Sequence, residues 1–407
     1  MAFDFTSSLS SRAGASAARW SGLPPYHFVG GNIDEPTVPA DALADAVQKV
    51  LRAEGHAMAK YGMNSGPQGY LPLRAFIAGN LGRRTGMQIG PEDVLITSGS
   101  LQAMELVYAA FLDPGDTVVL EDANYGGKIS RLRAAGAQAV PIELDEGGMR
   151  MDRLREAMAR LSDEGKRAKY IYTIPTIQNP TGTIMSESRR GEMLEIAAEY
   201  NVPIFEDDCY ADLIWSGDRP PAIYALDDDA RTVYCGTFSK TIAPALRVGY
   251  LVAPWSIMSH VLPLKTDAGS GALEQMVLAE YLPDNFDAHV DHILPVLKAK
   301  AEAMTSALDE HFGASADYLP PVGGIYLWVT LPEQVDTRKL AAAAAAEGIA
   351  LNPGPDWTVD AEASKHRMRL CFGHPTIEAI RNGVAKLADV CHREFGVPVR
   401  SSNVARS

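Results

Sequence analysis

The fold is decided by seven short runs between residues 90 and 255: DVLIT (93–97), DTVVLE (116–121), QAVPIE (138–143), AKYIYT (168–173), VPIFED (202–207), RTVYC (231–235) and VGYLVA (248–253). Each run is rich in β-branched and aromatic residues, and most are short enough for one buried strand. Stretches with helical spacing of apolar residues lie between them, such as SLQAMELVYAAFL (100–112). Strands that alternate with helices predict an α/β fold with a mostly parallel, seven-stranded sheet flanked by helices.

The pattern changes after about residue 285. A long helical stretch comes first, followed by two apolar runs that are separated by an alanine-rich helix, and by a final helix. This order predicts a second, smaller α+β domain. We therefore expect an N-terminal arm (1–25), a part of the small domain with a linker (26–60), a large cofactor-binding domain (61–284), the C-terminal small domain (285–398) and a frayed tail (399–407).

Composition narrows the class of protein. A net charge of −14 without basic blocks argues against nucleic acid and anionic membranes as partners. No stretch approaches the ~20 apolar residues of a membrane span, and the first residues lack a signal-peptide pattern, so we expect a cytoplasmic protein. The four cysteines are far apart, which indicates neither a disulfide framework nor a metal site.

Polar residues stand where several of the predicted strands end, and ligands of such sheets bind at that edge. Ser98, Gly99 and Ser100 follow the first strand and open a helix, as a phosphate site requires, although an ordinary N-capped turn looks the same. The other polar residues at strand ends are Asn179 to Gly182, Asp207, Asp208, Tyr210, Thr237, Ser239, Lys240 and, before the last strand, Arg247.

Each of these segments has an ordinary explanation by itself. Asn179 with Pro180 is a common turn, paired acids can cap a strand in solvent, and a lone lysine such as Lys240 is usually a surface charge. Chance does not readily explain all of them in a fixed order at one edge of one sheet. The combination therefore favours a functional site at this edge of the sheet.

Four motifs carry a resemblance to a known family. NPTG (179–182), the D-x-x-Y of 207–210, T-F-S-K (237–240) and R-L-x-F (369–372) occur in the order found in the class I/II aminotransferases, which are fold-type I pyridoxal phosphate enzymes. The resemblance covers nearly the whole chain. It implies an enzyme that moves an amino group between an L-amino acid and a 2-oxo acid.

The resemblance also implies roles for single residues. Lys240 carries pyridoxal 5'-phosphate as a Schiff base and shuttles the proton, and Asp207 pairs with the ring nitrogen. Arg369 grips the substrate carboxylate, with Asn179 and Gly31 nearby. The remaining cofactor contacts are Asn179 and Tyr210 at the phenolic oxygen, Tyr125 against the ring, and Ser98, Gly99, Ser100, Thr237 and Arg247 at the phosphate.

A homodimer with shared active sites follows from the same resemblance. Tyr61 resembles a tyrosine that reaches the phosphate of the partner subunit, but the stretch YGMNSGPQGYLPLR (61–74) has extra residues, which puts this role in doubt. The segment TDAGSGALEQ (266–275) is a second candidate contribution across the interface.

Two other functions remain open at this stage. The same scaffold supports pyridoxal phosphate-dependent lyases and oxidases, because the carbanion on the cofactor can be directed to several products. A transcriptional regulator with an aminotransferase-like sensor domain is a weaker alternative, because the stretch before Tyr61 is short for a DNA-binding domain and its linker.

Overall fold

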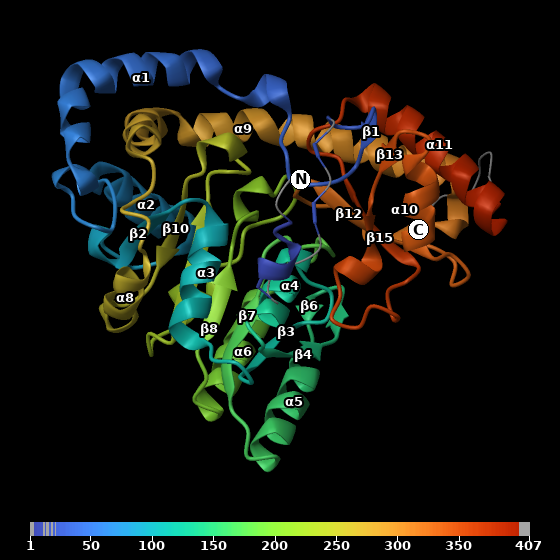
Figure 1. Cartoon of the computed structure of the whole chain (residues 1–407), viewed down its shortest axis with the longest axis horizontal. Helices are drawn as coiled ribbons and strands as arrows, with labels where there is room; N and C mark the ends of the chain where they lie inside the picture. Colours follow the sequence, from blue (N-terminus) through green and yellow to red (C-terminus); the bar gives the residue numbers. More distant parts are fainter. Residues whose placement is uncertain (1–3, 11–12, 14–15, 18, 21, 399–407) are drawn as a thin grey trace.

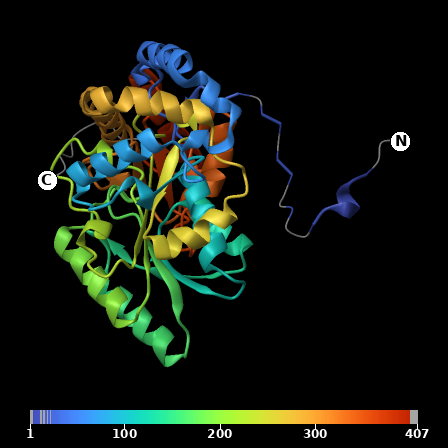
Figure 2. The same ribbon diagram turned by 90° about the vertical axis from the view of Figure 1, so that its left-hand side faces the viewer.

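The computed structural model describes residues 4–10, 13, 16–17, 19–20 and 22–398, so the predicted tail (399–407) lies outside the described residues. Figure 1 shows the two main sheets, with the larger one in the lower part of the view and the smaller one to the right. The described part of the segment before residue 26 extends away from the body of the molecule (Figure 2).

The larger sheet has seven strands in the order β2-β10-β9-β8-β7-β3-β4. All seven predicted runs form these strands, so the predicted sheet is confirmed. They are β2 (Val94–Thr97), β3 (Thr117–Glu121), β4 (Gln138–Ile142), β7 (Ala168–Thr173), β8 (Ile204–Asp207), β9 (Thr232–Thr237) and β10 (Gly249–Val252). Only β10 runs antiparallel to its neighbours β2 and β9. The start of β10 therefore lies at the same edge as the ends of the other six strands.

Helices cover both faces of this sheet, because alternate residues of each strand face opposite ways. Leu95 and Tyr172 pack under α3 (Ser100–Phe111), α4 (Gly126–Ala134) and α8 (Trp255–Val261). Ile171 and Ile204 pack against α5 (Met151–Asp163) and α6 (Glu187–Glu199) on the other face. Near β2, α2 (Leu71–Thr85) and α9 (Ala272–His311) complete that second face.

The smaller sheet is antiparallel, with four strands in the order β11-β12-β15-β14. These strands are β11 (Asp317–Tyr318), β12 (Tyr326–Thr330), β14 (Asn352–Pro353) and β15 (Arg367–Cys371). The helices α10 (Thr337–Ala345) and α11 (Ile377–Phe395) share an apolar core with it. The short strand β1 (Tyr26–His27) pairs with β13 (Ile349–Ala350), which ties the N-terminal part of the chain to this half.

The long helix α9 crosses the molecule above the larger sheet (Figure 1). It begins at Ala272, earlier than the helical stretch expected after residue 285, and it contains Pro283 and Pro295. Its buried residues contact both halves, and α1 (Ala40–Glu54) packs along it. Proline usually ends a helix, so packing on both sides overrides that local preference here. Among the described residues no helix is both long and apolar enough to span a membrane.

A buried arginine fixes the loop that follows β7. Arg190 on α6 is fully buried and donates hydrogen bonds to the carbonyl oxygens of Pro175, Met185 and Pro221 and to the Thr176 hydroxyl. One guanidinium nitrogen lies 3.8 Å from Glu206, and burial raises the pKa of that carboxyl group to about 7. The loop that carries Asn179 therefore depends on one cation beneath it.

We expect Arg190→Met to lower the free energy of unfolding by about 3–5 kcal/mol, because it leaves buried carbonyl groups without a donor and Glu206 without its nearby cation. Urea unfolding of the purified protein measures this loss. Arg155→Met is the matched control, because Arg155 pairs with Glu199 on the surface and should cost less than about 1 kcal/mol. An Arg190 variant as stable as that control would contradict the prediction.

Candidate active site

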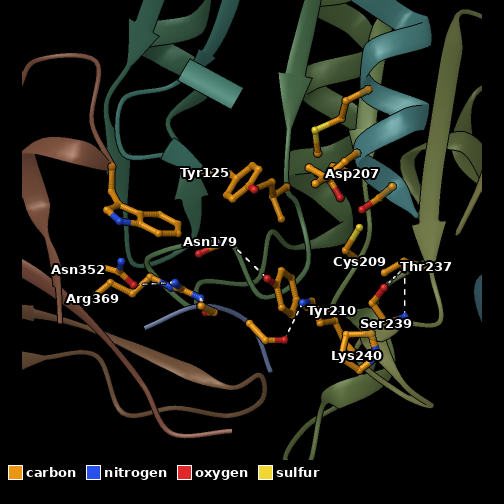
Figure 3. Close-up of a pocket in the computed structure, with 18 of the residues that line it drawn as sticks. Tyr125, Asn179, Asp207, Cys209, Tyr210, Thr237, Ser239, Lys240, Asn352 and Arg369 are labelled. Carbon is orange, nitrogen blue, oxygen red and sulfur yellow. Dashed lines mark hydrogen bonds between the residues drawn. The ribbon is translucent and has the colours of Figure 1, made fainter. Parts of the chain in front are cut away.

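A cavity of about 280 Å³ lies between the carboxyl edge of the larger sheet and the smaller sheet. Figure 3 shows side chains from both halves that point into it. Ten predicted site residues line the cavity: Gly31, Ser100, Tyr125, Asn179, Asp207, Tyr210, Thr237, Lys240, Arg247 and Arg369. Most of the residues predicted from the sequence therefore lie around a single cavity.

Lys240 lies three residues beyond β9, at the floor of the cavity. Its amine donates a hydrogen bond of 2.8 Å to the carbonyl oxygen of Gly31 and lies 5.9 Å from the centre of the Tyr210 ring. No carboxylate forms an ion pair with it among the described residues. Burial lowers the pKa of this amine below its usual value. A larger share of Lys240 is therefore uncharged and can act as a nucleophile or base.

Asp207 is the last residue of β8 and is buried. Its Oδ2 accepts a hydrogen bond of 2.6 Å from the Tyr172 hydroxyl, whereas Oδ1 has no hydrogen-bond partner in the described structure. Burial raises the pKa of this carboxyl group, against the opposing effects of the Cys209 thiol, the Tyr172 hydroxyl and the charge of Lys128. A buried carboxylate with a free oxygen can receive a cationic N–H group from a ligand.

Asn179 and Tyr210 form a pair of donors beside Lys240. The Asn179 amide donates to the Tyr210 hydroxyl at 3.4 Å, and the amide oxygen of Asn179 is buried without a partner. The ring of Tyr210 packs edge-on against Tyr326 of the smaller sheet. Two neighbouring polar side chains that can form further hydrogen bonds therefore face the cavity (Figure 3).

The N-terminus of α3 and Arg247 form an anion-binding corner. The backbone of Gly99 has φ of 74°, and a Cβ atom there would lie 2.3 Å from Nη2 of Arg247. Arg247 itself has φ of 53°, and Nη2 donates to the carbonyl oxygen of Ser98. The hydroxyl of Thr237 donates to Ser239, and both line the cavity. A helix N-terminus, hydroxyl groups and a guanidinium together suit a phosphate.

Arg369 enters the cavity from β15 of the smaller sheet. It is only 2% exposed, and it donates hydrogen bonds to the carbonyl oxygen of Gly30 and to Oδ1 of Asn352. The aromatic rings of Trp357 and Tyr326 lie 4.3 and 4.6 Å from its guanidinium carbon. No carboxylate pairs with it among the described residues, and Nε has no partner. A buried guanidinium without a carboxylate partner can bind a carboxylate from a ligand.

Three predicted contacts lie elsewhere. Ser98 and Gly99 adjoin the cavity through Arg247 but do not line it. Tyr61 is 90% exposed and lines a separate hollow of about 780 Å³ with Lys265 and residues 267–270. Within one chain, Tyr61 therefore does not reach the site.

Asn352 and Trp357 also line the cavity but were not predicted from the sequence. Asn352 reaches the site because its short strand pairs with β15, where it lies opposite Arg369. Trp357 lies in the following loop, and its ring packs against that of Tyr125 with centroids 5.9 Å apart. A tryptophan in the proline- and glycine-rich stretch NPGPDWT (352–358) was the available signal for this loop.

Cys209 lies beside the cavity, and its sulfur, that of Cys235 and an oxygen of Asp207 lie within 4.8 Å of one another. These three atoms could hold a metal ion, but burial raises the pKa of Cys235 well above its usual value, which opposes the thiolate that a metal requires.

The residues of the cavity fit pyridoxal 5'-phosphate. The free oxygen of Asp207 suits the protonated ring nitrogen, the corner at Gly99 and Arg247 suits the phosphate, and the amine of Lys240 suits the aldehyde. Tyr125 lines the same cavity, and its aromatic ring suits packing against the ring of the cofactor.

Comparison with known proteins finds the same family. Residues 31–387 match the family model "Aminotransferase class I and II". The aromatic-amino-acid aminotransferase 1 of Thermococcus litoralis is 34% identical over 371 residues, which are 90% of this chain and 88% of that protein.

Solved aminotransferase structures share the fold of this chain over nearly its whole length. The kynurenine aminotransferase of Pyrococcus horikoshii, solved in complex with PMP, has a TM-score of 0.85 and 33% identity over 91% of each chain. The multiple substrate aminotransferase of Thermococcus profundus has a TM-score of 0.88 and 32% identity over 97% of this chain and 100% of that one. The chain belongs to the class I and II aminotransferases, which are fold-type I pyridoxal phosphate enzymes.

Proposed function

We propose that this aminotransferase moves the amino group of an L-amino acid with an aromatic or aliphatic side chain to a 2-oxo acid, with Lys240 as the Schiff-base lysine. The observation that carries the proposal is the charge pattern of the cavity. The carboxylate of Asp207, the amine of Lys240 and the guanidinium of Arg369 all line it without an ion-pair partner among the described residues.

The bound cofactor supplies an aldehyde that condenses with amines and a ring that withdraws electrons from the substrate α-carbon. Asp207 would hold the protonated ring nitrogen through its free oxygen, and Asn179 and Tyr210 would hold the phenolic oxygen. Arg369 holds the substrate carboxylate and so orients the bond to be broken. The Nζ of Lys240 takes the α-proton and delivers it again, and the Gly31 carbonyl oxygen holds that amine while it is free.

The choice of substrate follows from the lining of the cavity. Its basic residues are Lys240, Arg247 and Arg369. Each already has a proposed role, so none of the described lining residues is left to pair with a second carboxylate of the substrate. Leu101, Met104 and Trp357 provide apolar surface in the same cavity. The names of the aromatic-amino-acid and kynurenine relatives support an aromatic substrate.

A half-reaction screen tests the proposal. The purified protein with pyridoxal 5'-phosphate is mixed with one amino acid at a time, and loss of the visible absorption of the lysine-bound cofactor is followed. We expect phenylalanine, tyrosine and leucine to react faster than aspartate, and keto-acid formation to require a 2-oxo acid acceptor. Ammonia or peroxide without an acceptor would instead indicate a lyase or an oxidase.

Lys240→Ala should lower turnover by at least about 100-fold and remove the visible absorption of the lysine-bound cofactor, because both depend on the same amine. Absorption spectra and steady-state rates measure the two effects. The control is Lys339→Ala, whose lysine is exposed on α10. Near wild-type transamination by the Lys240 variant would refute the assignment.

Arg369→Lys should lower kcat/KM for the amino acid by about 10- to 100-fold, because lysine keeps the charge but loses the two-pronged contact with a carboxylate. Cofactor content should stay unchanged, since the cofactor contacts lie at the larger sheet. Arg338→Lys on the surface serves as the control. An unchanged kcat/KM would remove Arg369 from substrate binding.

We further propose a homodimer in which Tyr61 completes the site of the partner subunit. An exposed tyrosine beside a hollow lined by Lys265 and residues 267–270 supports this proposal. Sedimentation should give twice the mass of one chain, and Tyr61→Phe should weaken cofactor binding several-fold without changing that mass, because one hydrogen bond to a phosphate is lost. A monomer with full activity would contradict both parts.

A further inference from the structure

A buried lysine lies behind Asp207, and no step described above uses it. Lys128 is the third residue of α4, and its side chain is fully buried between that helix and the larger sheet. No ion pair involves it in the described part of the chain. Its amine has one hydrogen bond, at 3.2 Å to the hydroxyl of Tyr170. Burial of a cationic group in this way is costly and calls for a physical reason.

Four aromatic rings surround the amine of Lys128. The ring centres lie at 3.9 Å for Tyr172, 4.3 Å for Tyr108, 4.8 Å for Tyr170 and 5.1 Å for Phe205. These rings come from α3 and from strands β7 and β8. Aromatic faces carry partial negative charge and attract a cation, more strongly where water is excluded. The cage therefore favours the charged form of the amine.

The nearest of these rings, that of Tyr172, connects Lys128 to Asp207 in the proposed cofactor site. Tyr172 has the Lys128 amine over its ring, and its hydroxyl donates to Oδ2 of Asp207 at 2.6 Å. A cation over a phenol ring draws electron density away from the hydroxyl, which strengthens it as a donor. Burial alone lowers the pKa of Lys128 well below its usual value, and the charge of Asp207 is the largest effect that opposes this. The aromatic cage acts in the same direction as Asp207, so both favour the ammonium form over the neutral amine.

We propose that Lys128 is a positioning residue for the cofactor. Its ammonium, held in the aromatic cage, acts through the Tyr172 hydroxyl to keep Asp207 ionised, so that Asp207 can bind a protonated ring nitrogen. The other oxygen of Asp207, which has no partner, is the one left for that nitrogen. This inference rests on the proposed function, because it assigns Lys128 a part in cofactor binding.

The test compares two ligands: pyridoxal 5'-phosphate and an analogue in which carbon replaces the ring nitrogen. Lys128→Met should weaken binding of pyridoxal 5'-phosphate by about 10-fold, the equivalent of one pKa unit, because Asp207 is then more easily protonated. The same variant should bind the analogue like the wild type, because the analogue has no ring nitrogen. Equal losses for both ligands would indicate a merely structural role and overturn the proposal.

A second variant keeps the test decisive if Lys128→Met does not fold. Tyr172→Phe removes the hydroxyl that contacts Asp207 and keeps the ring, so it should weaken binding of pyridoxal 5'-phosphate but not of the analogue. Tyr234→Phe is the matched control, because its buried hydroxyl contacts Asp208 at 3.0 Å instead. Wild-type affinity of the Tyr172 variant for pyridoxal 5'-phosphate would overturn the proposal.

The double variant tests whether the two residues act as one unit. If Lys128 acts through Tyr172, the loss in the double variant should be no larger than the larger single loss. Fully additive losses would contradict the connection. A wild-type protein that does not bind pyridoxal 5'-phosphate through Lys240 would refute the proposed function itself, whereas wild-type behaviour of the Lys128 variant would refute only this inference.

Discussion

Two opposite charges are buried in one cavity, and neither has its counter-ion in the described chain. Asp207 enters from the larger sheet and Arg369 from the smaller one. Each charge would be costly to bury unless a ligand supplied the missing partner. Much of the surrounding structure stabilises these two groups: the Tyr172 hydroxyl and Lys128 support the carboxylate, and Asn352 with two aromatic rings supports the guanidinium.

The topology of the larger sheet collects the remaining groups at the same edge. Six strands end there, and the single antiparallel strand β10 begins there, so Arg247 meets the N-terminus of α3 although they are far apart in sequence. The short segment around Gly30 and Gly31 then joins the two halves, because its carbonyl oxygens accept hydrogen bonds from Arg369 and Lys240. The site is thus built from the edges of two sheets and one crossing segment.

The sequence predicted the larger sheet well, because strands buried on both faces form short apolar runs that stand out from their surroundings. Ten of its predicted site residues line the cavity: most of them follow or precede such strands, whereas Tyr125, Arg369 and Gly31 came from the family resemblance. Asn352, Trp357 and Lys128 were missed because their positions depend on how distant elements pack. The proposed boundaries at 61–284 and 285–398 stay predictions, and α9 runs through the junction between them. The cytoplasmic location also stays a prediction.

The pairing of β1 with β13 has a consequence for the order of folding. His27 and Ala350 are partners although more than 300 residues separate them in sequence, and the Phe28 carbonyl oxygen accepts a hydrogen bond from Cys371. Contacts between residues so far apart in sequence tend to form after local ones, because closing the long loop between them has a larger entropic cost. We therefore expect the crossing segment at Gly30 and Gly31 to dock after the larger sheet has formed, which would leave the cavity open on that side until then.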